Sequence, residues 1–174
     1  FLPRFIEKIA GGQTKAPFGD AVIATRDTCI GFEICEELWN PQSSHIDMAL
    51  DGVEIIVNGS GSYMELRKAY VAVELVRSAT AKSGGCYLFS NLRGCDGERV
   101  YFNGCSSIFL NGELLNRTEQ FAVEEVEVAT ATIDLEDIRS YRNEIRSRCL
   151  RAASAKPYPR IELGNFSLSG ESDF

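Results

Sequence analysis

The chain has 174 residues, 44% of them hydrophobic, which predicts one globular unit with a buried core. Its formal net charge is −7, from 25 acidic and 18 basic residues, and this argues against a nucleic-acid partner, because phosphate binding needs a basic surface. No run of apolar residues approaches the roughly 20 that span a membrane, so no membrane partner is expected.

The first half of the chain is predicted to alternate strands and helices. Apolar runs typical of strands lie at 21–25, 29–35, 53–57 and 86–90. Segments typical of helices lie at 41–50 and 64–82. The longer helix is expected to pack through one face, formed by Leu66, Ala69, Tyr70, Val73 and Val76. This order predicts an α/β fold, in which helices cover a sheet.

The second half begins with short strands joined by turns. Asn-Gly pairs at 103–104 and 111–112 separate apolar runs at 100–102, 106–110 and 113–115, a pattern typical of hairpins. A strand at 127–134 and a helix at 135–150 are predicted to follow. The arginines of this helix are expected to form a solvated or subunit-facing surface: Arg139, Arg142, Arg146, Arg148 and Arg151.

The cysteines and the chain ends bear on cofactors and location. The six cysteines form no CxxC pair and His45 is the only histidine, so neither a zinc site nor another cofactor is expected within the chain. Thiols in apolar runs are typical of a reduced, cytoplasmic protein. The chain begins at Phe1 rather than at methionine, and we expect both of its ends to continue.

The main candidate for chemistry is Cys35, where an apolar strand ends and Glu36, Glu37 and a turn follow. A strand-to-helix turn can expose a nucleophile and direct backbone N–H groups at a developing oxyanion. The alternative is a small core cysteine. Neighbouring carboxylates disfavour a thiolate, so a catalytic Cys35 needs a base or a cation from elsewhere. His45 is either the partner in a Cys/His dyad or a structural residue.

Several segments resemble eukaryotic glutamine-dependent NAD synthetases. The most specific are 33–41 (Glu-Ile-Cys-Glu-Glu-Leu-Trp-Asn-Pro), 45–52 (His-Ile-Asp-Met-Ala-Leu-Asp-Gly) and 58–62 (Asn-Gly-Ser-Gly-Ser). Further similar segments occur in the same order at 17–21, 66–68, 135–142 and 157–160. The resemblance therefore covers about residues 3–160.

This resemblance implies a fold, an activity and partners. The family's glutaminase domain is a nitrilase-like four-layer α-β-β-α sandwich, which releases ammonia from glutamine with a Glu/Lys/Cys triad. A synthetase domain, which uses ATP and Mg, amidates nicotinic acid adenine dinucleotide to NAD with that ammonia. Residues 1–155 are then expected to form a glutaminase (carbon-nitrogen hydrolase) domain incomplete at its N-terminal side, and 156–174 a linker towards the synthetase domain. Homo-oligomers are also implied.

The resemblance also assigns site residues. Cys35 is the nucleophile that forms a γ-glutamyl thioester, and Glu36 is expected to meet the substrate ammonium. Ser60 and Ser62 are expected to hydrogen-bond the substrate carboxylate or amino group, and Arg67 to pair with the carboxylate. Each of these four has a plain alternative: Glu36 caps a helix, the serines shape a turn, and Arg67 lies on a solvated face.

The family's catalytic glutamate and lysine are expected upstream of these residues. The lysine lies in an Arg-Pro-Lys-Met-like motif that is not found here, and Lys8 and Lys15 lack that context. The 174 residues alone are therefore expected to be inactive. Trp39 is predicted to pack in a core or an interface. Two other functions stay open: another nitrilase-superfamily amidase, or a truncated, non-catalytic interaction module.

Overall fold

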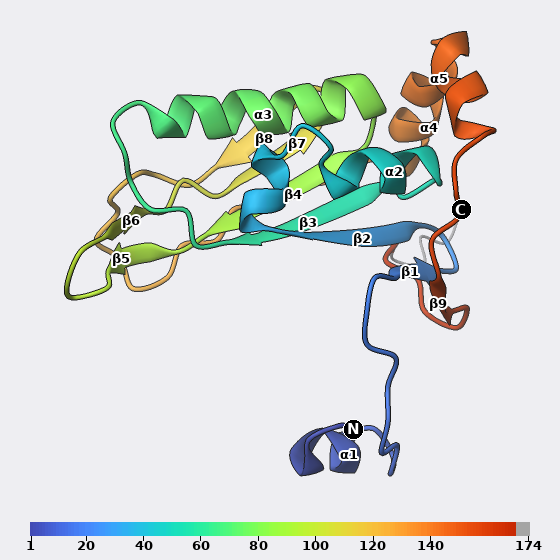
Figure 1. Ribbon diagram of the computed structural model, residues 1–174, viewed down its shortest axis with the longest axis horizontal. Coiled ribbons are helices and arrows are strands. Elements are labelled where there is room, and N and C mark those ends of the chain that lie inside the picture. The colour runs from blue at the N-terminus through green and yellow to red at the C-terminus, as the bar shows by residue number, and fades with distance from the viewer. Residues whose placement is uncertain (170–174) are drawn as a thin grey trace.

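The computed structural model describes residues 1–169, which form a large sheet, a two-stranded ribbon and several helices (Figure 1). The helices are α1 (Arg4–Ile9), the short 3-10 helix η1 (Cys35–Trp39), α2 (Ser44–Leu50), α3 (Lys68–Ser83), α4 (Leu135–Asn143) and α5 (Arg146–Ala152). The strands are β1 (Val22–Thr25), β2 (Cys29–Ile34), β3 (Ile55–Ser60), β4 (Cys86–Asn91), β5 (Arg93–Cys95), β6 (Tyr101–Asn103), β7 (Ser107–Leu110), β8 (Glu113–Arg117) and β9 (Arg160–Leu163).

The large sheet has the strand order β8-β7-β4-β3-β2-β1-β9. Its centre is parallel, because β2 pairs with β3 and β3 with β4 in the same direction. On one side of this centre β4 pairs antiparallel with β7, and on the other β2 pairs antiparallel with β1. The predicted α/β fold is confirmed. The carboxyl ends of the three central strands therefore meet at one edge, where α/β proteins commonly place their ligands.

Helices α2 and α3 cover one face of the sheet, and the core lies between them and the strands (Figure 1). Met48 from α2, Val76 from α3 and Phe109 from β7 are at most 1% exposed. Gly31 in β2 allows α2 to approach, since a Cβ at this position would lie 2.5 Å from Met48 Sδ. Burial of these apolar side chains stabilises the packing of the helices on the sheet.

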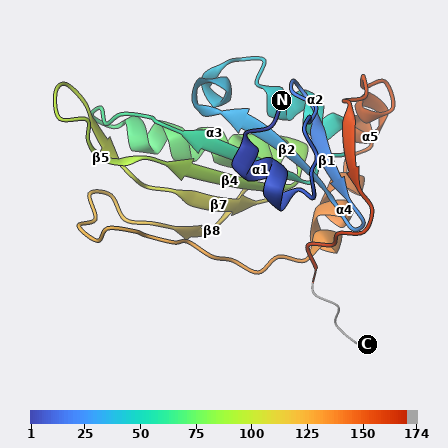
Figure 2. The ribbon, with the colours of Figure 1, turned by 90° about the horizontal axis from the view of Figure 1, so that it is seen from below.

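The other face of the sheet lies in front in Figure 2, with α3 behind the strands and α1 nearest the viewer. Side chains of β2 alternate between the faces, so Gly31 and Glu33 are buried, whereas Phe32 and Ile34 are 48% and 70% exposed. Helices α2 and α3 thus lie on the opposite face of the large sheet from α1. Exposed apolar side chains on the open face fit the predicted four-layer sandwich, in which a second sheet packs there.

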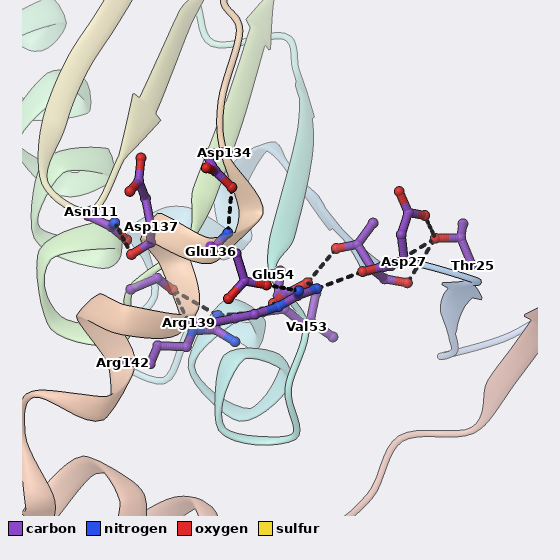
Figure 3. Close-up of polar contacts among 12 residues, drawn as sticks. Thr25, Asp27, Val53, Glu54, Asn111, Asp134, Glu136, Asp137, Arg139 and Arg142 are labelled. Carbon is purple, nitrogen blue, oxygen red and sulfur yellow. Dashed lines mark hydrogen bonds and ion pairs between the residues drawn. The ribbon is translucent and has the colours of Figure 1, made fainter. Parts of the chain in front are cut away.

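Helix α4 is anchored by two arginines that point into the protein (Figure 3). Arg139 donates from Nε to Glu54 Oε1 at 2.9 Å and from Nη2 to the carbonyl of Asp27 at 2.7 Å. Arg142 donates from Nη2 to the carbonyls of Val53 at 2.6 Å and Gly84 at 2.8 Å. For Arg142 the predicted solvated or subunit-facing surface is wrong, because its guanidinium satisfies buried backbone carbonyls, whereas Arg139 stays partly exposed while it binds Glu54.

Other local predictions also need correction. The predicted helix at 135–150 is divided at Ile145, whose backbone is extended with a φ of −111°. The helix predicted from residue 64 begins at Lys68, because Arg67 has a φ of +67°, and Leu66 and Tyr70 are exposed rather than packed. Residues 127–134 join no sheet in the described part of the chain, and the carboxylate of Glu127 binds the Arg93 side chain.

The sequence did not predict α1 or β9. Strand β9 lies within the segment expected to be a linker, and it pairs parallel with β1. The carboxylate of Asp51 fixes the start of β9. Its Oδ2 accepts hydrogen bonds from the backbone N–H of Tyr158 at 2.9 Å and from Nη1 of Arg160 at 2.8 Å. The boundary at residue 155 stays a prediction, and residues 170–174 of the expected linker lie outside the described residues. Within residues 1–169, every helix is too short or too polar to cross a membrane.

Replacing Arg142 with alanine is expected to loosen α4, because the carbonyls of Val53 and Gly84 lose their donor. An unsatisfied buried polar group costs about 1–3 kcal/mol, which corresponds to roughly 5- to 150-fold faster amide exchange from local opening. Hydrogen exchange measured by mass spectrometry on peptides that cover 135–143 tests this in the complete protein. Arg151→Ala, at an exposed position, is the matched control, and equal exchange in both variants would contradict the anchoring role.

Candidate functional site

Cys35 lies where β2 ends and η1 begins, at the edge formed by the carboxyl ends of the parallel strands. Its side chain is partly buried and its backbone φ is +42°. A non-glycine residue at positive φ costs about 1–3 kcal/mol and persists only where surrounding contacts enforce it. The predicted strand-to-helix turn is therefore present, and it is strained as in nucleophile elbows. The role of Cys35 itself stays a prediction.

Glu37 closes this turn from the side of the helix. Its carboxylate accepts the N–H of Ile34 at 2.7 Å through Oε2 and the hydroxyl of Ser44 at 3.0 Å through Oε1. This acidic neighbour of Cys35 thus has a structural task of its own. Glu36 is exposed, and its N–H lies in the first turn of η1, where a helix leaves N–H groups without intrahelical partners.

Asn58 closes the turn from the side of the sheet. Its Oδ1 accepts the N–H of Cys35 at 2.9 Å, and its Nδ2 donates to the hydroxyl of Tyr87 at 2.9 Å. Asn58 lies on β3 and is fully buried. The backbone of Cys35 is therefore held by a side chain from the neighbouring strand.

The hydrogen bonds continue from Tyr87 to a buried carboxylate. Tyr87 donates to Glu33 Oε2 at 2.6 Å, while Glu33 Oε1 accepts the backbone N–H of His45 at 2.6 Å and its Nδ1–H at 3.0 Å. Burial acts to raise the pKa of Glu33, but these hydrogen bonds outweigh it and hold the pKa below its usual value. Burial, and then Glu33 itself, raise the pKa of Tyr87, which stays a neutral donor.

His45 therefore resolves one alternative left open by the sequence. Its ring nitrogen binds Glu33, it is 8% exposed, and within residues 1–169 it makes no hydrogen bond to Cys35. This arrangement favours the structural role over a Cys/His dyad. Trp39 is partly buried against the core, as predicted, and the ammonium of Lys68 lies 5.6 Å from its ring centroid.

The predicted substrate residues differ in their surroundings. The register of β2 and β3, with Ile34 opposite Gly59, places Cys35 and Ser60 at adjacent strand ends. Ser60 Oγ is buried and has no hydrogen-bond partner among the described residues, a costly state that a ligand or water would relieve. Ser62 is tied through its backbone to the Asn91 side chain, and Arg67 is exposed at the start of α3.

Sequence reasoning missed Glu33, Asn58 and Tyr87 as a connected group. A signal existed for Glu33, because it is a charged residue inside an apolar run at the position that alternation assigns to the buried face. Within the described residues, no group of three or more His, Cys, Asp or Glu is arranged to hold a metal ion.

Comparison with known sequences identifies a matching family and several named relatives. The sequence model of the carbon-nitrogen hydrolase family matches residues 2–143. The glutamine-dependent NAD(+) synthetase of Drosophila melanogaster is 66% identical over 99% of this chain and 22% of its own length. The human protein of that name is 57% identical over 99% of this chain and 24% of its own length. The chain thus spans about a quarter of these relatives.

Solved structures agree with the fold. A glutamine-dependent NAD(+) synthetase from Cytophaga hutchinsonii is 27% identical, with a TM-score of 0.53 over 62% of this chain and 17% of that chain. A carbon-nitrogen hydrolase from Helicobacter pylori is 24% identical, with a TM-score of 0.57 over 67% of this chain and 43% of that chain. The second of these likenesses concerns the fold alone.

The buried thiol of Cys86 offers a test of the packing around β4. Burial raises its pKa to about 11, so only about one molecule in a thousand carries the reactive thiolate at pH 8. We expect iodoacetamide to label Cys86 at least about 100-fold more slowly in the native protein than in denaturant. Labelling should accelerate as the pH rises towards 11. Peptide mapping measures both rates, and rapid native labelling at pH 8 would show that the strand is open to solvent.

Proposed function

The chain belongs to the carbon-nitrogen hydrolase family, and from this membership we propose that it forms the glutaminase part of a glutamine-dependent NAD synthetase, with Cys35 as nucleophile. The strained turn that presents Cys35 at the carboxyl ends of the parallel strands is the observation that carries the proposal. The identity of more than half of its residues to named NAD synthetases from fly and human supports the same substrate.

The proposed reaction is hydrolysis of glutamine to glutamate and ammonia. The Cys35 thiolate attacks the carbon of the side-chain amide, and the N–H of Glu36 donates to the oxyanion that forms. The carbon–nitrogen bond then breaks, ammonia leaves with a proton from a general acid, and a γ-glutamyl thioester remains. Water cleaves this thioester and regenerates the thiol. A glutamate and a lysine supplied from outside these 174 residues complete the proposed triad.

Substrate recognition is proposed for the residues around this turn. The exposed carboxylate of Glu36 suits the α-ammonium of glutamine, and the unpartnered hydroxyl of Ser60 suits a polar atom of the same substrate. Ser62 and the guanidinium of Arg67 suit the α-carboxylate. Arg67 is exposed, and its side chain makes no capping hydrogen bond to α3.

The remaining partners follow from the same proposal. Ammonia passes to a synthetase domain of the same chain, which uses ATP and Mg to amidate nicotinic acid adenine dinucleotide. We also propose that the protein is a cytoplasmic homo-oligomer. The six cysteines, all free in the structure, support a reducing compartment.

The test is NAD formation by the complete protein carrying Cys35→Ala, supplied with glutamine or with ammonia. With glutamine, we expect the rate of NAD formation to fall at least about 1,000-fold, because the covalent route is removed. With ammonia, the rate should be near normal. Cys95→Ala, which removes an exposed thiol, is the control and should retain both activities.

Each other outcome has a definite meaning. Retention of both activities in Cys35→Ala would remove Cys35 from the reaction. Failure of the unsubstituted protein to form NAD from either nitrogen source would instead favour another amidase of the family or a non-catalytic module. A glutamine-like electrophile should also label Cys35, and labelling of Cys86 in its place would contradict the assignment.

A further inference from the structure

We propose that Asn58 is a positioning residue for Cys35, and that the buried carboxylate of Glu33, acting through Tyr87, sets the orientation in which Asn58 holds the Cys35 backbone. This inference rests on the proposed function. It concerns residues that touch neither the substrate nor the reacting atoms, and it explains how the strained turn is kept in one geometry.

The first step is the contact that replaces the end of the strand ladder. Beyond Ile34, β2 has no further backbone pairing with β3, and the N–H of Cys35 meets the Asn58 side chain instead, at 2.9 Å. The positive φ of Cys35 turns the chain away from the sheet at this point. The side chain of Asn58 is therefore the contact that ties Cys35, where the turn begins, to the sheet.

The second step is the direction of the hydrogen bonds. An ionised carboxylate can only accept, so the Tyr87 hydroxyl must donate its single hydrogen to Glu33. The oxygen of Tyr87 is then left to accept, and it accepts from Asn58 Nδ2. The amide of Asn58 can satisfy this only with Oδ1 facing Cys35, which is the acceptor that the Cys35 N–H needs. The charge on Glu33 thus decides which end of the amide faces the nucleophile.

The third step is what fixes the carboxylate. Glu33 is 1% exposed and is held by the backbone and ring of His45, so it cannot turn to solvent. His45 comes from α2, Tyr87 from β4, Asn58 from β3 and Glu33 from β2. Residues from four separate elements therefore form one chain of hydrogen bonds that ends at the backbone N–H of Cys35. Because that N–H is engaged, the N–H of Glu36 is left as the local donor to an oxyanion.

The first test uses Tyr87→Phe in the complete protein, which removes the hydroxyl in the middle of this relay and preserves the ring. We expect the kcat for glutamine-dependent NAD formation to fall about 10- to 100-fold, because a misplaced nucleophile slows the chemical step. The KM for glutamine should change less than about threefold, and ammonia-dependent NAD formation should be unchanged.

Thr28→Val is the matched control for this variant. Thr28 lies just before β2, and its hydroxyl also donates to a buried glutamate, Glu54, at 2.7 Å. This contact lies at the opposite end of β2 from Cys35. The control should therefore keep its kcat with glutamine, although it loses the same kind of hydrogen bond as Tyr87→Phe.

The second test uses Asn58→Asp and the pH dependence of kcat relative to the unsubstituted protein. Protonated, the introduced carboxyl group can accept from Cys35 and donate to Tyr87, as the amide does; ionised, it can only accept. The titratable groups that face it are Glu33 from β2, Tyr87 from β4 and His45 from α2, with Cys35 and Glu37 from η1. The kcat of Asn58→Asp, divided by that of the unsubstituted protein, should fall as the pH rises. The same ratio for Asn58→Leu should be low at every pH, because leucine offers neither hydrogen bond.

The outcomes separate this inference from the proposed function. If the unsubstituted protein uses glutamine and Tyr87→Phe keeps its kcat, or loses glutamine- and ammonia-dependent activity equally, the positioning role is wrong. A pH-independent ratio for Asn58→Asp would overturn it as well. If the unsubstituted protein does not use glutamine, the proposed function itself fails.

Discussion

Parallel pairing of β2 with β3 and of β3 with β4 is the interaction on which the core and the site both depend. The register sets Glu33 beside Asn58, and it directs their side chains, with that of Tyr87, towards the helices. A slip of one residue would turn each side chain to the other face of the sheet. It would also separate Asn58 from the N–H of Cys35. The same backbone hydrogen bonds thus build the core and position the candidate nucleophile.

Much of the sheet could be predicted from the sequence, because its strands carry a local signal. Continuous apolar runs at 21–25, 29–35, 53–57 and 86–90 correspond to β1, β2, β3 and β4. Strand β9 could not be predicted in this way, since its residues are largely exposed and its position depends on pairing with β1 and on contacts with Asp51. The division between α4 and α5 at Ile145 was likewise not predicted, because the segment carries no glycine or proline to mark it.

The candidate site was predictable to a smaller extent. A cysteine at the end of an apolar strand marks the turn, and the structure places it there. The contacts that hold the turn join residues up to 54 positions apart, such as Tyr87 and Glu33, so they exist only after the sheet has formed. Single polar residues in apolar runs indicate that buried partners must exist, but they do not say which residues those partners are.

The opposite pKa shifts of Glu33 and Tyr87 have a consequence for the whole relay. Glu33 stays ionised down to a lower pH than usual, and Tyr87 stays neutral up to a higher one. Between these limits neither group gains or loses a proton, and Nδ1 of His45 carries a hydrogen whether its ring is neutral or charged. The hydrogen bonds that join Glu33, Tyr87 and Asn58 to the backbone of Cys35 are therefore kept across this pH range. Within this range, a proton gained or lost elsewhere near the turn leaves the direction of these three hydrogen bonds unchanged.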